Sequence, residues 1–228
     1  MSVPLITFTN PKGGSSKTTS AFLLATCLAQ RGEQVALVDS DPNAPLLRFE
    51  HLRSQPVPNL TFHRANSDSM YDVLDPLLEQ KDWVIVDTEG TANMAVGMAL
   101  NRSDLAIIPI SMSRLDIDQA AKAIKLVQTQ AKGLKRPIPC RLLYTRVNAA
   151  MVSSSERRIR RDVDGSGIGA FHVKIVHRAA YTGMFEHNLT LWEMEPKVSG
   201  LPNAIENAVS FTDEVVATIL ASLEGAKP

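Results

Sequence analysis

The chain has 228 residues, of which 44% are hydrophobic and 21% charged, which is enough to bury one good core, so we expect a single domain over residues 1–228. Lys and Arg number 24, as do Asp and Glu, so no net charge draws the whole molecule to nucleic acid or acidic lipid, and such contacts need a local patch. Cys27 and Cys140 lie far apart in apolar segments. This excludes a disulfide framework and a cysteine metal site.

The N-terminal residues run directly into the apolar segment Val3–Phe8, without a charged leader or a cleavage site. No apolar run reaches the length of a membrane span. We therefore expect a cytoplasmic protein with no stable membrane association.

Short apolar runs alternate with longer helical patterns along the chain, which predicts parallel strands joined by crossover helices. The runs are nearly unbroken rather than alternating, as expected when helices cover both faces of a sheet. The predicted fold class is a doubly wound α/β fold with a mainly parallel sheet. Strands are expected at Leu5–Thr9, Gln34–Asp39, Trp83–Asp87, Leu105–Ile110, Cys140–Thr145 and Val173–His177, and helices at Lys17–Gln30, Asp116–Ala131, Ser153–Asp162 and Ala204–Leu223. No structure is predicted for Arg48–Arg64.

A glycine-containing loop joins the first predicted strand to the first predicted helix. Backbone N–H groups in such a loop and the positive end of the helix favour phosphate binding. Lys17 is placed to reach the β- and γ-phosphates of a nucleotide, and the Thr18 hydroxyl to ligate Mg²⁺. Gly13 and Gly14 allow close approach of the backbone. The loop reads Pro11-Lys12-Gly13-Gly14-Ser15-Ser16-Lys17-Thr18-Thr19.

The strict pattern G-x-x-x-x-G-K-[ST] is not met, because Pro11 and Ser16 stand where it has its outer glycines. A positive φ at Ser16 would cost about 1–2 kcal/mol. With two lysines, the loop resembles the deviant Walker A motif of the ParA/MinD family of P-loop NTPases. The resemblance implies that ATP and Mg²⁺ are bound, with nucleotide contacts from Lys12 through Thr19. It also implies that Lys12 reaches across a dimer interface to the partner's nucleotide.

Two carboxylates follow the second predicted strand, in Asp39-Ser40-Asp41-Pro42-Asn43. The carboxyl edge of an open α/β sheet is where ligands bind. The segment resembles the D-x-D-P-Q switch I of the family, which implies that Asp41 positions the attacking water and that Asp39 supports Mg²⁺ through water. The alternative for both residues is a helix N-cap or an Asx-turn before Pro42.

Trp83–Asp87 is an apolar strand that ends in a carboxylate, like a Walker B element whose aspartate holds the Mg²⁺ shell. Asp87 is therefore the third predicted residue on the metal side, with Thr18 and Asp39. The family continues this element with proline, whereas this chain continues with Glu89 and Gly90. A solvated loop glutamate is favoured over a general base at Glu89, and Gly90 retains an N–H to offer the γ-phosphate.

The fifth predicted strand is followed by Tyr144-Thr145-Arg146-Val147-Asn148, where the family contacts adenine. The resemblance implies that Arg146 stacks on the base and that Asn148 hydrogen-bonds its edge. A strand-end arginine that faces solvent is the alternative.

A basic cluster offers a local DNA surface, because phosphate contacts need no base-reading geometry. The cluster consists of Arg157, Arg158, Arg160 and Arg161, to which Lys122, Lys125, Lys132, Lys135 and Arg136 could add. A solvated basic helix is the alternative.

The resemblance covers nearly the whole chain and is closest to small ParA plasmid-partition ATPases. It implies an ATP-dependent homodimer, nonspecific DNA binding, nucleoid association and weak hydrolysis stimulated by a ParB-like or other small adaptor. A relative that aids T-DNA transfer has a segment similar to Leu115–Asp118.

The alternatives are a MinD-like or ParA-like ATPase that positions a protein cargo, and a nucleotide-binding scaffold with little hydrolysis. A MinD-like membrane helix is disfavoured, because Phe211–Glu224 carries only acidic charges. Iron–sulfur carriers of this fold are disfavoured because paired metal-binding cysteines are absent.

Overall fold

The computed structural model describes residues 3–91, 93–111, 114–148 and 168–225. A seven-stranded sheet in the order β3-β2-β4-β1-β5-β6-β7 forms its centre, and every pair of neighbouring strands is parallel. The strands are β1 (Leu5–Phe8), β2 (Val35–Asp39), β3 (Leu60–Arg64), β4 (Trp83–Asp87), β5 (Leu105–Ser111), β6 (Cys140–Val147) and β7 (Ile175–Val176). The predicted doubly wound α/β fold is confirmed.

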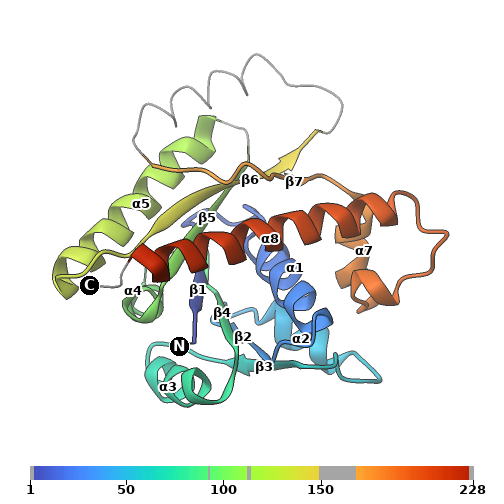
Figure 1. Cartoon of the computed structure of the whole chain (residues 1–228), viewed down its shortest axis with the longest axis horizontal. Coiled ribbons are helices and arrows are strands. Elements are labelled where there is room, and N and C mark those ends of the chain that lie inside the picture. The colour runs from blue at the N-terminus through green and yellow to red at the C-terminus, as the bar shows by residue number, and fades with distance from the viewer. Residues whose placement is uncertain (1–2, 92, 112–113, 149–167, 226–228) are drawn as a thin grey trace.

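The helices connect and cover these strands (Figure 1). They are α1 (Lys17–Gln30), α2 (Pro45–His51), α3 (Met70–Gln80), α4 (Met94–Arg102), α5 (Arg114–Leu134), α7 (Ala179–His187) and α8 (Leu201–Gly225), with a 3-10 turn η1 (Leu191–Glu193). The predicted helix Ser153–Asp162 lies outside the described residues. The other three predicted helices are confirmed, with somewhat longer bounds for α5 and α8.

Successive residues of each strand enter different cores on the two faces of the sheet, as the period of two requires. Ile6 and Phe8 of β1 pack with α1, α7 and α8, whereas Leu5 packs with α3 and α4. On the second face, α5 packs against β5 and β6. Figure 1 shows α1 and α8 on one side of the sheet and α3, α4 and α5 on the other. The unbroken apolar strands are thus explained by burial on both faces.

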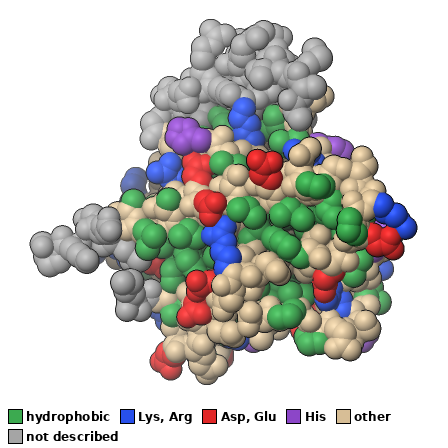
Figure 2. All heavy atoms as spheres, turned by 45° about the vertical axis from the view of Figure 1, so that its right-hand side comes forward, with side chains coloured by type: hydrophobic (Ala, Val, Ile, Leu, Met, Phe, Trp, Pro, Cys, Tyr) green, Lys and Arg blue, Asp and Glu red, His purple; other side chains and the backbone are tan. Residues whose placement is uncertain are grey.

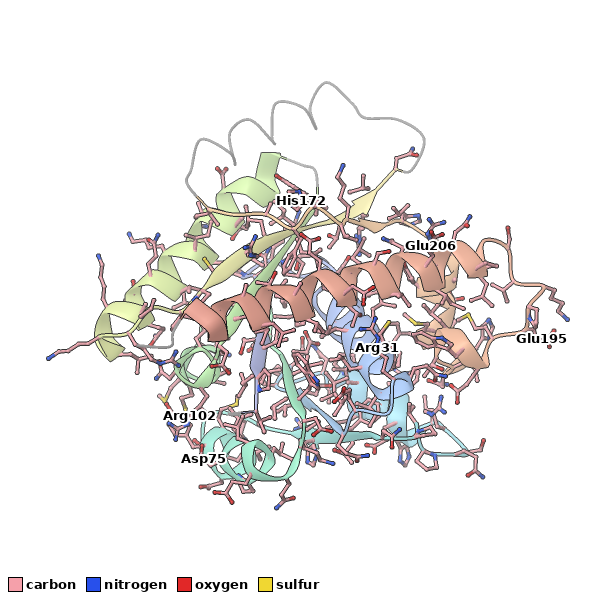
Figure 3. The ribbon with its side chains drawn as sticks, viewed as in Figure 1. Arg31, Asp75, Arg102, His172, Glu195 and Glu206 are labelled. Carbon is pink, nitrogen blue, oxygen red and sulfur yellow. The ribbon has the colours of Figure 1, made fainter. Side chains whose placement is uncertain are left out.

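Ion pairs fasten helices to one another at the surface. Asp75 of α3 and Arg102 of α4 approach to 2.9 Å, and both are labelled in Figure 3. Arg31, just after α1, pairs with Asp213 of α8 at 2.7 Å. The face in Figure 2 carries acidic, basic and apolar side chains interspersed, which agrees with the formal net charge of zero. Exposed pairs of this kind each contribute about 1 kcal/mol or less.

All strands run the same way, so their carboxyl ends share one edge of the sheet. Asp39 at the end of β2 and Asp87 at the end of β4 are partners in the sheet register, and Phe8 at the end of β1 is also a register partner of Asp87. The sheet therefore brings the Pro11–Thr19 loop, called the phosphate loop after its predicted role, and the two predicted acidic segments to one place.

Candidate nucleotide-binding site

The phosphate loop leaves β1 at Phe8 and enters α1 at Lys17. Gly14 has φ 73°, and Ser16, the N-cap of α1, has φ 70° and ψ 25°. The left-handed conformation costs a non-glycine residue about 1–2 kcal/mol. The sequence-based concern about Ser16 is therefore justified, since its position does have the positive φ that glycine would adopt without strain.

Asn10 anchors the start of this loop, a role that the sequence analysis missed. Its buried side chain donates to the Pro109 carbonyl of β5 at 2.7 Å and accepts from the Lys12 N–H at 2.9 Å. An asparagine between a strand and a glycine-containing loop is the signal that could have revealed it. Asn10 fixes the backbone at Lys12 relative to the central strands.

Lys17 is buried, with only 7% of its surface exposed. Its Nζ donates to the carbonyls of Asn10 and Lys12, at 3.0 and 3.2 Å, so the ammonium group lies against the loop that precedes α1. Burial lowers the pKa of Lys17, opposed by the nearby carboxylates of Asp87, Asp41 and Glu89. A phosphate at the loop would add further negative charge beside the amine and favour its charged form.

Thr18 and Asp87 face each other across the start of α1 and the end of β4. The Thr18 hydroxyl donates to Asp87 Oδ2 at 2.6 Å, while Oδ1, also buried, has no hydrogen-bond partner among the described residues. Burial raises the pKa of Asp87 to about 7. A buried carboxylate oxygen without a partner beside a threonine hydroxyl fits Mg²⁺, which needs only one or two carboxylates when phosphates and water complete its shell.

Asp39 is buried, and both of its carboxylate oxygens accept hydrogen bonds from backbone N–H groups. Its Oδ1 accepts from the Asp41 N–H at 3.0 Å, and its Oδ2 accepts from the Leu46 and Leu47 N–H groups at 2.8 and 3.4 Å. Burial raises the pKa of Asp39, and these hydrogen bonds oppose the rise. The contact with Asp41 is the Asx-turn of the alternative reading, and the contacts with Leu46 and Leu47 fix the start of α2, whose N-cap is Ala44. The support of Mg²⁺ by Asp39 stays a prediction.

Asp41 forms an Asx-turn at the start of the loop that leads to α2. Its Oδ1 accepts from both the backbone N–H and the side-chain amide of Asn43, at 2.8 and 3.0 Å. Asp41 is half-buried and Asn43 is exposed, so the carboxylate lies at the surface of the site. That Asp41 positions the attacking water stays a prediction, because the contacts of this turn do not test it.

The segment after β4 closes on the phosphate loop. A Cβ on Gly90 would lie 3.1 Å from the Gly13 nitrogen, so no larger residue fits without a shift. The Glu89 carboxylate accepts from the Asn93 side chain at 2.6 Å, and Asn93 in turn caps α4 through the Val96 N–H. Glu89 is therefore hydrogen-bonded to the residue that caps α4. This contact does not favour a role for Glu89 as a general base.

Arg146 lies beside the loop, with φ 55° and its Nε 3.2 Å from the Ser16 hydroxyl. It lines a cavity of about 270 Å³ together with Ser16 and Thr19. The other wall comes from β7 and α7, including Arg178, Tyr181 and Phe185, which the sequence analysis did not identify. Asn148, the other predicted base contact, is exposed just after β6 and is not part of this lining.

The predicted DNA-binding residues Arg157, Arg158, Arg160 and Arg161 lie outside the described residues. Lys122 and Lys125 are exposed on α5, as is Lys132 at its end. Arg136 does not belong to this surface, because its guanidinium donates to the carbonyls of Asn101 and Ser103. Arg136 instead binds the carbonyl groups at the end of α4.

The model of a protein family described as "VirC1 protein" matches residues 3–219. The chain belongs to the VirC1 protein family. A ParA protein from Rhizobium radiobacter is 29% identical over 225 residues, covering 97% of this chain and all of the relative. A virC1 protein from the same organism is 31% identical over 160 residues, covering 68% of this chain and 69% of the relative. The assignment to ParA-like partition ATPases is confirmed at the level of the family.

Among solved structures, a Cyanothece McdA variant in complex with ATP superposes with a TM-score of 0.77 at 15% identity, covering 95% of this chain and 97% of that one. At this identity the likeness supports the fold alone. Every helix among the described residues of this VirC1 family member is too short or too polar to span a lipid bilayer. The described residues also contain no cluster of three or more His, Cys, Asp or Glu side chains that could hold a metal ion.

Proposed function

We propose that this ParA-like partition ATPase binds ATP with Mg²⁺ at the Pro11–Thr19 loop, dimerises around the nucleotide and binds DNA nonspecifically while ATP is bound. The observation that carries the proposal is the Thr18–Asp87 pair, whose open Oδ1 lies beside the phosphate loop. The ATP complex of the structurally similar McdA variant supports the choice of nucleotide. Family membership supports the partition role.

Each residue of the site has a separate role in the proposed hydrolysis of ATP. Lys17 leaves the Asn10 and Lys12 carbonyls for the β- and γ-phosphates. Asp87 and Thr18 hold the metal, which neutralises developing charge on the phosphates when bound. Asp39 keeps the start of α2 in place, and its own support of the metal through water is part of the proposal. Asp41 orients a water that attacks the γ-phosphorus as the bond to ADP breaks.

Lys12 is assigned to the partner's nucleotide in the dimer. Its backbone is fixed by Asn10 at 2.9 Å, next to the exposed Gly13 and Gly14. A cation supplied in this way would offset charge on the transferring phosphoryl group only after dimerisation. Hydrolysis thus depends on assembly, which is consistent with weak intrinsic activity and stimulation by a ParB-like or other small adaptor.

The base is assigned to the cavity beside Arg146. Its guanidinium offers a planar face for stacking, and Thr19 and Ser16 connect the cavity to the phosphate loop. Asn148 remains a proposed contact to the base edge. The cavity supports adenine at this end of the nucleotide.

DNA binding is assigned to Arg157, Arg158, Arg160 and Arg161, with Lys122 and Lys125 adding charge from α5. Dimerisation doubles this charge, and phosphate contacts make the affinity strongly salt-dependent. Localisation in the cytoplasm, on the nucleoid in the ATP state, follows from the same proposal.

A nucleotide-binding scaffold with little hydrolysis is the second candidate, favoured by the strained Ser16 and by the engagement of Glu89 with α4. Phosphate release in the presence of DNA and the adaptor decides between the two.

The test combines three measurements on the full chain: phosphate release, mass in solution by light scattering, and anisotropy of labelled DNA, each with ATP and with ADP. We expect a dimer and DNA binding with ATP alone. Replacing the four arginines by glutamine should leave ATP binding intact and remove DNA binding, while Lys81→Gln, a single distant cation, serves as control. DNA affinity and salt slope that survive the four replacements would move the DNA surface elsewhere.

A further inference from the structure

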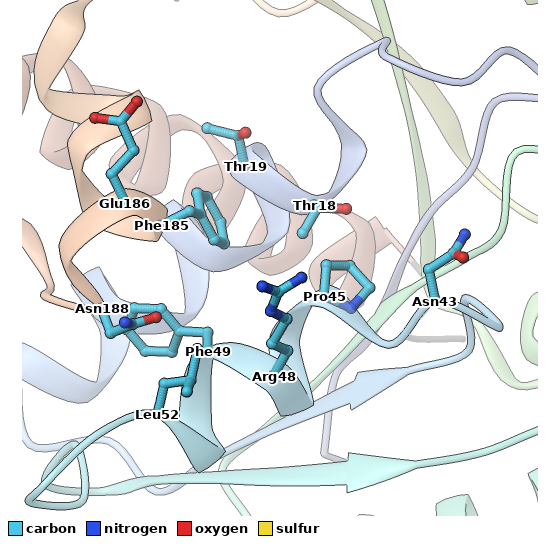
Figure 4. Close-up of a pocket in the computed structure, with 10 residues that line it drawn as sticks. All are labelled: Thr18, Thr19, Asn43, Pro45, Arg48, Phe49, Leu52, Phe185, Glu186 and Asn188. Carbon is cyan, nitrogen blue, oxygen red and sulfur yellow. The ribbon is translucent and has the colours of Figure 1, made fainter.

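A cavity that the sequence analysis did not predict adjoins the phosphate loop. It has a volume of about 610 Å³ and lies between the start of α1, α2 and α7 (Figure 4). Thr18 and Thr19 of the loop form one wall. Thr19 and Phe185 also line the smaller cavity at Arg146, so the two cavities meet around Thr19.

Arg48 of α2 points into this cavity toward the start of α1 (Figure 4). Among the residues that the structure describes, its guanidinium has no hydrogen-bond or ion-pair partner. Glu186 on the α7 wall lines the same cavity without pairing with it. The cavity thus presents an unneutralised cation with five N–H donors.

The wall that carries Arg48 is held firmly. At its start, Asp39 accepts from the Leu46 and Leu47 N–H groups. At its end, Arg53 forms a two-pronged ion pair with Glu193, at 2.6 and 3.0 Å, and donates to the Asn188 carbonyl at 2.7 Å. The Arg53 side chain is only 6% exposed. Arg48 within α2 and Arg53 just beyond its end therefore differ, because the guanidinium of Arg53 is hydrogen-bonded whereas that of Arg48 has no partner among the described residues.

The position of Arg48 in the chain adds a second argument. The α2 helix begins at Pro45, directly after the Asp41–Asn43 turn, so Arg48 belongs to the segment that carries the proposed water-positioning carboxylate. Opposite it are Thr18 and Thr19, in the first turn of α1, whose helix end favours anions. A planar guanidinium matches phosphate oxygens with two parallel hydrogen bonds.

We propose that Arg48 binds the phosphate groups of the nucleotide held by the Pro11–Thr19 loop. This rests on the proposed function and adds a third cation, supplied by the same protomer, to Lys12 and Lys17. Because Arg48 is on α2, phosphate binding and the placement of Asp41 become linked through one short helix.

The test compares Arg48→Gln with Lys81→Gln, which removes a cation at the end of α3 that does not line the cavity. The affinities of ATP and of adenosine are measured with Mg²⁺ by displacement of a fluorescent ATP analogue. We expect Arg48→Gln to weaken ATP binding by about 10–100-fold, the range for a charged hydrogen bond, with adenosine and the Lys81→Gln control unchanged. Arg48→Lys, which keeps the charge but loses the fork, should fall between.

Unchanged ATP affinity in Arg48→Gln would overturn the proposal, as would equal losses for ATP and adenosine. Normal ATP binding with impaired dimerisation would also overturn it, and would assign Arg48 to a second copy of the chain. If the unaltered protein bound no ATP, the proposed function itself would fail, so the two failures are distinguishable.

Discussion

The hydroxyl of Thr18 donates to the Asp87 carboxylate across 2.6 Å, joining the first turn of α1 to the end of β4. Asp87 is fully buried, and burial raises its pKa to about 7. Without Mg²⁺ and nucleotide, the folded protein therefore holds a proton that the unfolded chain, with an aspartate pKa of about 3.9, releases earlier. The contribution of Asp87 to the free energy of unfolding should therefore fall as the pH rises from about 4 to about 7.

Asp87→Asn should remove this pH dependence. In EDTA near pH 8, the variant should be more stable than the unaltered protein by on the order of 3 kcal/mol, because the charged carboxylate is no longer buried. Urea unfolding near pH 5 and pH 8 measures the difference, with the exposed Asp68→Asn as control. Mg²⁺ should stabilise the unaltered protein only. Equal pH slopes in the two proteins would contradict the burial argument.

Ser16→Gly should stabilise the protein by about 0.5–1 kcal/mol. Glycine relieves the left-handed strain at φ 70°, a gain reduced by greater freedom in the unfolded chain and by loss of the 3.2 Å contact with Arg146. Ser16→Ala keeps the strain and loses the contact, so it should be less stable than the unaltered protein. Chemical unfolding of all three ranks them; a glycine variant less stable than the unaltered protein would show that the hydroxyl contact and the greater freedom of glycine in the unfolded chain outweigh the strain.

Arg53→Met should destabilise the protein by about 2 kcal/mol, since it leaves Glu193 without its charged partner while Asn188 loses a donor. The loss is moderated by the 35% exposure of the Glu193 side chain. Thermal unfolding provides the measurement. Adding Glu193→Gln should recover part of the loss, and additive effects would contradict a direct coupling.

The two loop lysines should separate binding from assembly. Lys17→Ala should reduce ATP affinity by about 100-fold or more, because a buried cation against the phosphates is lost. Lys12→Ala should keep ATP binding but prevent ATP-dependent dimerisation and hydrolysis. Calorimetry and light scattering distinguish these results. A Lys12→Ala protein that still dimerises with ATP would refute the role across the interface.

The central strands could be predicted from the sequence because burial on both faces leaves continuous apolar runs, and Trp83–Asp87 has the same bounds in the structure. The edge strand β3 was missed because only Leu60 of its residues is buried. In α3, Pro76 obscured the helical pattern. At the other edge, the predicted Val173–His177 narrows to Ile175–Val176, since the Val173 N–H is bound by Glu214 instead.

In the site, too, some features could be predicted from the sequence and others could not. The Pro11–Thr19 loop and Asp87 are local patterns at strand ends, so their placement at one edge of the sheet could be predicted from the sequence, while their roles stay predictions. The α7 wall with Arg178 and Tyr181, and the saturation of Arg53, depend on elements that meet only in the folded chain. No local motif marks them.

The α8 helix has a consequence for synthesis of the protein. Its Asn207 binds the Val176 N–H and the Lys174 carbonyl, and its Glu214 binds the His172 and Val173 N–H groups. The edge strand β7, beside the proposed base cavity, is thus held by residues that leave the ribosome well after it. A nascent chain can complete the Pro11–Thr19 loop early, yet the wall of the proposed base cavity is complete only when α8 has emerged, so we expect newly made protein to be delayed in binding ATP.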